Sequence, residues 1–175
     1  MTDFSLHPFP GQDSGGVIIH GAIERTPHTL LLSFFLQGNM DDIVLPAETV
    51  RKRGDNLWQA TCFEMFWAEE GQKNYRELNL SPNGDWNVYA FTDYRTGMCQ
   101  EERIAEPLVK IKHTAEGFSL TAELEIGNLH AGQTPLRVGV SAVLKHRDAR
   151  LGHWALVHLG KNPDFHEPKA FLLRV

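Results

Sequence analysis

The chain has 175 residues, of which 22% are charged, and its formal net charge is -5 at pH 7. This length suits one compact domain with a sizeable core, so we expect a single domain over residues 1–175. A negative net charge provides no basic surface for nucleic-acid backbones, and no apolar run reaches the roughly 18 residues of a membrane span. Neither nucleic acid nor membrane is therefore an expected partner.

Residues 1–16 lack both the basic segment and the continuous apolar segment of a secretory leader, so we expect a cytoplasmic location. The chain contains two cysteines, Cys62 and Cys99. Two are too few for a disulfide framework, and their spacing does not suit a metal or redox pair. We expect ordinary thiols and no metal centre.

Short segments with β-branched or aromatic residues recur along the chain, and Gly, Pro and Asn separate them, which is typical of strands. We expect strands over residues 16–23, 29–38, 60–67, 75–81, 86–92, 108–114, 118–126, 136–145, 154–159 and 170–175. Residues 46–52 could form one helical turn. This pattern predicts an all-β fold, an antiparallel β-sandwich or jelly roll of about ten strands, because two facing sheets cover such apolar strands.

The dipeptide Asn83-Gly84 is a strong hairpin signal, because both central residues of a type I′ turn need positive φ. Folding the chain back around it predicts that Glu77 pairs with Ala90 and Asn79 with Val88. Glu77, Asn79 and Ser81 then share one face. The opposite face, which we expect to be buried between the sheets, holds an apolar set: Leu78, Leu80, Tyr89 and Phe91.

The preceding strand is aligned by its burial pattern, which leaves Glu64 on the same face as Glu77 and Asn79. Directly opposed residues have Cβ atoms about 5 Å apart, so Glu64 becomes a close neighbour of one of these two. Two facing carboxylates need a cation, a ligand with hydroxyl donors or a shared proton. Arg95, just after the third strand, is the nearest candidate for the cation.

Two interpretations of this polar face are open. It could be the solvated side of an antiparallel sheet. However, the prediction also places Phe66 and Trp86 there, with Trp58 at the strand entrance, so aromatic and hydrogen-bonding groups alternate. This mixture suits a sugar, whose C–H face stacks on an aromatic ring while its hydroxyls bind carboxylates and amides.

Three segments, residues 57–67, 75–98 and 153–171, resemble bacterial DOMON-like proteins related to family 9 carbohydrate-binding modules. The resemblance covers about residues 55–175, and it implies a β-sandwich with a carbohydrate or haem pocket on one sheet. In the sugar-binding modules a Trp precedes the strand Glu by six residues, as Trp58 precedes Glu64. The resemblance also implies a second stacking residue, for which Trp154 is the candidate and Phe165 the alternate. Cys62 stands where these modules carry a hydrogen-bonding amide.

Histidine and methionine residues raise the possibility of metal or haem binding. His153 and His158 lie five residues apart on one expected strand, so they should face opposite sides and not chelate one ion. Haem-binding relatives use a Met and a His. Met65 and Met98 are available for this, although Met65 suits the core better.

Residues 162–168 form a Pro-bracketed loop with two open interpretations. The loop could be an ordinary polar connection, or it could be a rim over the ligand face, with His166 contacting a bound hydroxyl. A glycosidase pair made of Glu64 and Glu77 is a further alternative, because retaining enzymes hold two carboxyl groups about 5–5.5 Å apart. Neighbouring strands produce such spacing by geometry alone, so we expect no catalytic residue.

The sequence therefore predicts non-catalytic binding of a sugar or similar polyhydroxylated ligand on one sheet face, with no cofactor. Alternatives are a protein-interaction or accessory domain, and a haem binder. The expected ligand-binding residues are Trp58, Glu64, Glu77, Asn79, Arg95, Trp154 and His166.

Overall fold

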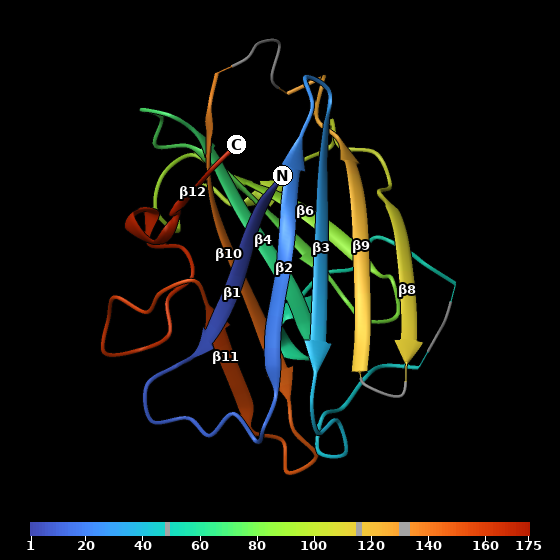
Figure 1. Cartoon of the computed structure of the whole chain (residues 1–175). Coiled ribbons are helices and arrows are strands. Elements are labelled where there is room, and N and C mark those ends of the chain that lie inside the picture. The colour runs from blue at the N-terminus through green and yellow to red at the C-terminus, as the bar shows by residue number, and fades with distance from the viewer. Residues whose placement is uncertain (48–49, 115–116, 130–133) are drawn as a thin grey trace.

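The computed structural model describes residues 1–47, 50–114, 117–129 and 134–175. These residues form a β-sandwich of two antiparallel sheets, which confirms the predicted all-β fold (Figure 1). Twelve strands are present in the described residues, somewhat more than the ten expected. None of the helices found in this part of the chain is long and apolar enough to cross a membrane.

The first sheet, sheet A, runs in the spatial order β8 (Leu108–Thr114), β9 (Gly117–Glu125), β3 (Thr29–Gln37), β2 (Ile18–Arg25) and β1 (Thr2–Pro8). Sheet B runs β7 (Cys99–Gln100), β6 (Trp86–Phe91), β5 (Tyr75–Leu80), β4 (Cys62–Glu69), β10 (Leu136–Lys145) and β11 (Leu151–Ala155), and β12 (Leu173–Arg174) pairs with β10. Strand β1 also pairs with β11, so the two sheets join along one side.

The main core lies between the sheets, and strand alternation explains it. On β3 and β9, every second residue is buried, as expected for strands with one face toward a core. Strand β4 differs, because all residues from Cys62 to Ala68 are buried. The outer face of sheet B carries a second apolar cluster made of Phe66, Ala68, Tyr75, Tyr89, Phe91 and Phe171, and Trp58 and Phe165 pack against it. Sheet B is therefore covered on both faces.

The β5–β6 hairpin has a register one residue away from the predicted one. Glu77 pairs with Tyr89 and not with Ala90, and Leu80 pairs with Trp86. The backbone N–H of Gly84 donates to the carbonyl of Ser81 at 2.9 Å, so the turn spans Pro82, Asn83 and Gly84.

Proline suits the first turn position, and only Gly84 of the three turn residues has positive φ, at 92°. Because a shift of one residue exchanges the two faces of a strand, Tyr89 and Phe91 lie on the outer face of sheet B. Trp86 lies in the main core and not beside Phe66.

Several strand predictions also need correction. The strand expected over residues 170–175 is limited to Leu173–Arg174, and Ala170 belongs to the 3-10 helix Pro168–Ala170. Strand β1 was not expected, because only Phe4 and Leu6 carry its buried face. Strand β11 covers Leu151–Ala155 and not residues 154–159, so His158 lies in the following loop. The helical turn expected over residues 46–52 includes residues 48–49, which lie outside the described residues.

Gly84→Ala should reduce the free energy of unfolding by about 1–2 kcal/mol, because alanine disfavours positive φ. Gly84→Asn should cost less, since asparagine tolerates this conformation better. In both variants the added Cβ would meet the flexible Arg51 side chain, whose nearest atom is 2.7 Å away. Urea denaturation measures the difference, and equal losses in the two variants would attribute the effect to Arg51 rather than to φ.

Candidate functional site

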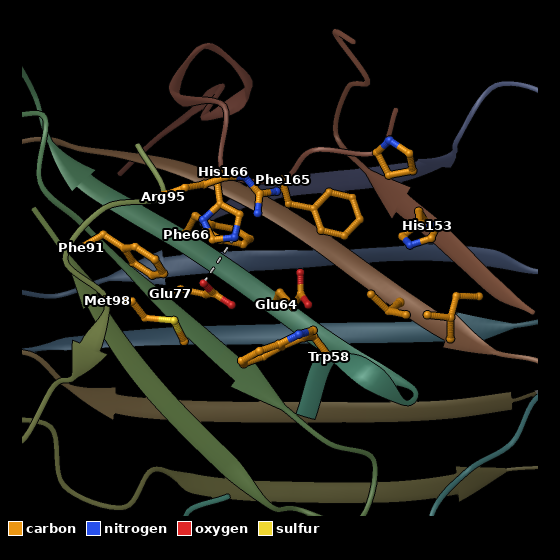
Figure 2. A pocket seen from close by; sticks show the side chains of 13 residues that line it. Trp58, Glu64, Phe66, Glu77, Phe91, Arg95, Met98, His153, Phe165 and His166 are labelled. Atoms are coloured by element: carbon orange, nitrogen blue, oxygen red, sulfur yellow. Dashed lines mark ion pairs between the residues drawn. The ribbon is translucent and has the colours of Figure 1, made fainter. Parts of the chain in front are cut away.

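The outer face of sheet B contains a cavity of about 380 Å³. Five of the seven predicted ligand-binding residues line it: Trp58, Glu64, Glu77, Arg95 and His166. Glu64 extends from β4 and Glu77 from β5, and both carboxylates point into the cavity in Figure 2. The predicted neighbour relation is confirmed, since Glu64 pairs directly with Asn79 and Glu77 is displaced by two residues along the same strand.

Each of the two carboxyl groups has one oxygen held by the protein. Ser141 Oγ donates to Glu64 Oε2 at 2.8 Å, and Asn79 Nδ2 donates to Glu77 Oε1 at 2.7 Å. The other oxygen of Glu64 has no hydrogen-bond partner among the described residues, and Glu77 Oε2 lies 3.8 Å from His166 Nε2. The protein thus fixes both carboxyl groups and leaves one oxygen of each for a ligand.

Burial raises the pKa of both carboxyl groups. The pKa of Glu64 rises to about 8, because the side chain is buried and Glu77 is nearby, and Ser141 only partly offsets this. The pKa of Glu77 rises to about 7 through burial, while Asn79 and Arg95 act in the opposite direction. At neutral pH Glu64 is therefore mostly protonated, and the pair carries fewer than two negative charges.

His166 forms the wall above Glu77 and is uncharged at neutral pH, because burial and the nearby Arg95 lower its pKa to about 4. The backbone N–H of Arg95 donates to the Tyr75 hydroxyl, which lies 2.8 Å from His166 Nδ1. If Tyr75 donates its own hydrogen there, the imidazole proton is on Nε2 and faces Glu77. The contact dashed in Figure 2 then joins a neutral imidazole to Glu77.

Arg95 belongs to a rim that connects two loops. Its Nη2 contacts Asp164 Oδ1 at 2.9 Å, and the Tyr94 hydroxyl donates to Asp164 Oδ2 at 2.5 Å. Asp164 lies in the loop of residues 162–168, so the interpretation of this loop as a rim agrees with the geometry. The predicted pairing of Arg95 with the two glutamates is only indirect, because its guanidinium binds Asp164.

Aromatic side chains form the remaining walls. Trp58, on the short 3-10 helix η1 (Leu57–Gln59), packs edge-on against Tyr89, with ring centroids 5.7 Å apart. Figure 2 places Trp58 and Phe165 on opposite sides of Glu64, with Phe66 partly hidden behind His166. The cavity therefore has ring surfaces at its sides and carboxyl groups on its floor.

Two of the predicted residues do not line the cavity. Asn79 is fully buried beneath it, where it donates to Glu77 and accepts from the Cys62 thiol at 3.5 Å. Trp154 lies in the main core, because alternation along β11 turns His153 outward and Trp154 inward. Phe165, the alternate that the resemblance offered, lines the cavity instead.

Sequence reasoning did not assign Phe91, Met98 and His153 to this site, although all three line it. Phe91 was missed through the register error, Met98 lies outside the expected strands, and His153 was considered only as a metal or haem ligand. Met65 is buried in the main core, as expected, so it cannot reach the cavity.

His153 and His158 are both within ring contact of Phe165, so the argument from strand parity against their joint action does not apply. Even so, the described residues contain no group of three or more His, Cys, Asp or Glu side chains arranged to hold a metal ion.

Comparisons of the sequence with family models and with curated proteins find no match. Solved structures do have similar folds. A proposed carbohydrate-binding protein from Bacteroides uniformis ATCC 8492 matches 98% of this chain and 84% of its own, with a TM-score of 0.67 and 11% identity. A family 9 carbohydrate-binding module from Caldicellulosiruptor kristjanssonii, in complex with cellotriose, matches 88% of this chain and 71% of its own, with a TM-score of 0.52 and 12% identity.

At these identities the likeness concerns the fold. The chain has the β-sandwich architecture found in these two proteins. A relation to the DOMON-like group stays a prediction.

Proposed function

We propose that this protein binds a carbohydrate, without catalysis, in the cavity on the outer face of sheet B. The observation that carries the proposal is the combination of aromatic walls and polar floor: Trp58 and Phe165 lie around Glu64 and Glu77. A proposed carbohydrate-binding protein and a module in complex with cellotriose, both with the same architecture, support it. The cytoplasmic location and the DOMON-like relation are further parts of this proposal.

The chemistry of the cavity suits a sugar ring. Trp58 and Phe165 offer flat apolar surfaces to its C–H groups, and Trp58 is only partly buried, so its ring is accessible. A protonated Glu64 beside a partly ionised Glu77 can both accept hydrogen bonds from hydroxyls and donate one. The carboxyl groups on the cavity floor would therefore orient the sugar, and the aromatic rings at the sides would stack against it.

A binding role fits the two glutamates better than a glycosidase role. In glycosidases the two carboxyl groups flank the scissile bond. Here both glutamates project from neighbouring strands on the cavity floor, so both would lie on the same side of a bound sugar. Incubation with oligosaccharides should accordingly yield no hydrolysis products.

Trp58→Ala should weaken sugar binding at least about tenfold, which corresponds to about 1.4 kcal/mol, because the ring supplies stacking surface. A glycan array identifies ligands, and titration calorimetry measures the dissociation constant of each variant. Phe35→Ala is the matched control, since Phe35 is a partly exposed aromatic residue on sheet A, and it should leave the affinity unchanged.

Two results would contradict this proposal. One is no binding of any mono- or oligosaccharide at millimolar concentrations. The other is oligomerisation that Trp58→Ala abolishes and sugars do not affect, which would identify the aromatic wall as a protein interface.

A further inference from the structure

We propose that the ligand of this cavity is an amino sugar, whose protonated amine lies between the free carboxyl oxygens of Glu64 and Glu77. This inference rests on the proposed function and narrows its ligand class. It starts from the arrangement of charges around the floor, where two acidic side chains converge without a cation of their own.

The side chains around the pair compensate its negative charge only in part. Arg95 is the strongly basic group among the described cavity-lining residues, and its guanidinium contacts Asp164 at 2.9 Å. Burial lowers the pKa of both His166 and His153, so neither imidazole supplies a charge at neutral pH. Burial also raises the pKa of the Cys62 thiol above its ordinary value, so this group is neutral too.

Glu64 and Glu77 retain acceptor capacity in the cavity. Both residues are more than nine-tenths buried, with exposed fractions of 3% for Glu64 and 4% for Glu77, yet each has only one carboxyl oxygen hydrogen-bonded to the protein. Ammonium has three donors and no acceptor, so it satisfies two such oxygens at once. A hydroxyl of a neutral sugar has one donor and supplies no charge.

The walls are also suitable for a cation. Trp58, Phe66, Phe91 and Phe165 surround the floor. The faces of aromatic rings attract cations, and this attraction strengthens where water is excluded. An amine attached to a sugar ring would thus meet carboxylates below and rings at the sides, while the ring of the sugar stacks as proposed above.

Binding should release protons, because ammonium favours the ionised form of both carboxyl groups. The free protein holds a proton on the pair at neutral pH, because the pKa values are about 8 for Glu64 and about 7 for Glu77. When the protonated amine enters, this proton leaves to the solvent. A neutral sugar gives no such displacement.

The test uses three trimers with the same β-1,4-linked backbone, which differ only at C2: cellotriose, the trimer of glucosamine, and its N-acetylated form. Calorimetry at about pH 6, where the amine of the free ligand is already largely protonated and takes up little further proton, should show at least tenfold tighter binding of the glucosamine trimer. Repeating the titration in two buffers of different ionisation enthalpy should show proton release for that trimer alone. The double variant Glu64→Gln/Glu77→Gln should lose the preference, while Glu123→Gln, an exposed glutamate on sheet A, should keep it.

The outcomes separate this inference from the proposed function. If cellotriose binds as tightly as the glucosamine trimer or tighter, the amino-sugar inference is wrong and sugar binding stands. If the double variant still prefers the glucosamine trimer, the inference is also overturned, because the two carboxyl groups would then not be the groups that bind the amine. If none of the three trimers and no other glycan binds, both proposals fail.

Discussion

Glu64→Gln should raise the free energy of unfolding at about pH 8 by about 2–4 kcal/mol and change it little at about pH 5. The reason is the cost of an ionised carboxylate in the folded protein. The pKa of Glu64 rises from 4.5 to about 8 on burial, whereas the unfolded chain keeps an ordinary value. One pKa unit corresponds to about 1.4 kcal/mol, so the pKa shift of Glu64 sets an upper bound of about 5 kcal/mol on the stability gain of Glu64→Gln. Solvent that reaches the carboxyl group through the cavity makes the gain smaller than this bound.

The sign follows from proton binding. Above the ordinary pKa, unfolded Glu64 and Glu77 lose their protons, while the folded protein keeps them until the pH passes about 7 to 8. The folded state binds more protons over this window, so stability declines as pH rises through it. Glutamine resembles the protonated acid and stays neutral, so the variant removes the contribution of Glu64 to this decline.

Urea denaturation at the two pH values measures the effect, with Glu123→Gln as the matched control. Glu123 is exposed on β9, and its substitution should change the free energy of unfolding by less than about 0.5 kcal/mol at both values. Equal stability of wild type and Glu64→Gln at about pH 8 would show that the carboxyl group is hydrated and its charge is tolerated.

Such an increase would also bear on function. A buried carboxyl group that lowers stability, in a protein where glutamine would be more stable, serves something other than folding. The cavity above Glu64 and Glu77 is the place where such a functional role would be exercised.

The β-sandwich was predictable from the sequence because the alternation of apolar and polar residues marks most of its strands. The β4 alignment was also correct, since Phe63, Met65 and Trp67 form one buried row and leave Glu64 opposite Asn79. A pattern with period two is local, so it can be read without knowing which strand lies next.

The errors arise where one residue or one distant loop decides the outcome. Pro82 converts the expected two-residue turn into a three-residue one, which turns Tyr89 and Phe91 outward and Trp86 inward. The loop that carries Phe165 and His166 covers the outer face through tertiary contacts and has no sequence period to indicate it. Spacing alone therefore could not choose between Trp154 and Phe165 as the second aromatic wall.

Asn79→Asp should be the most damaging conservative change near the site, with a loss of about 3–5 kcal/mol in the free energy of unfolding at about pH 8. Asn79 has no exposed surface, and its amide donates to Glu77 while its carbonyl oxygen accepts from the Cys62 thiol. Aspartate removes the donor and adds a third buried carboxyl group beside Glu64 and Glu77. Because the added group can be protonated, part of the loss should be recovered at about pH 5.

Asn79→Ala separates the lost hydrogen bond from the added charge. It also leaves Glu77 without its donor, but it introduces no acid, so its loss should be smaller, about 1–3 kcal/mol, and should not shrink on acidification as the aspartate loss does. Asn39→Asp, at an exposed turn where the side-chain oxygen accepts from the Asp41 N–H, should be nearly neutral. If Asn79→Ala and Asn79→Asp lose the same stability at both pH values, charge plays no part there. A larger, pH-dependent loss in Asn79→Asp would mean that the side chain that holds Glu77 in place beside Glu64 has to be neutral.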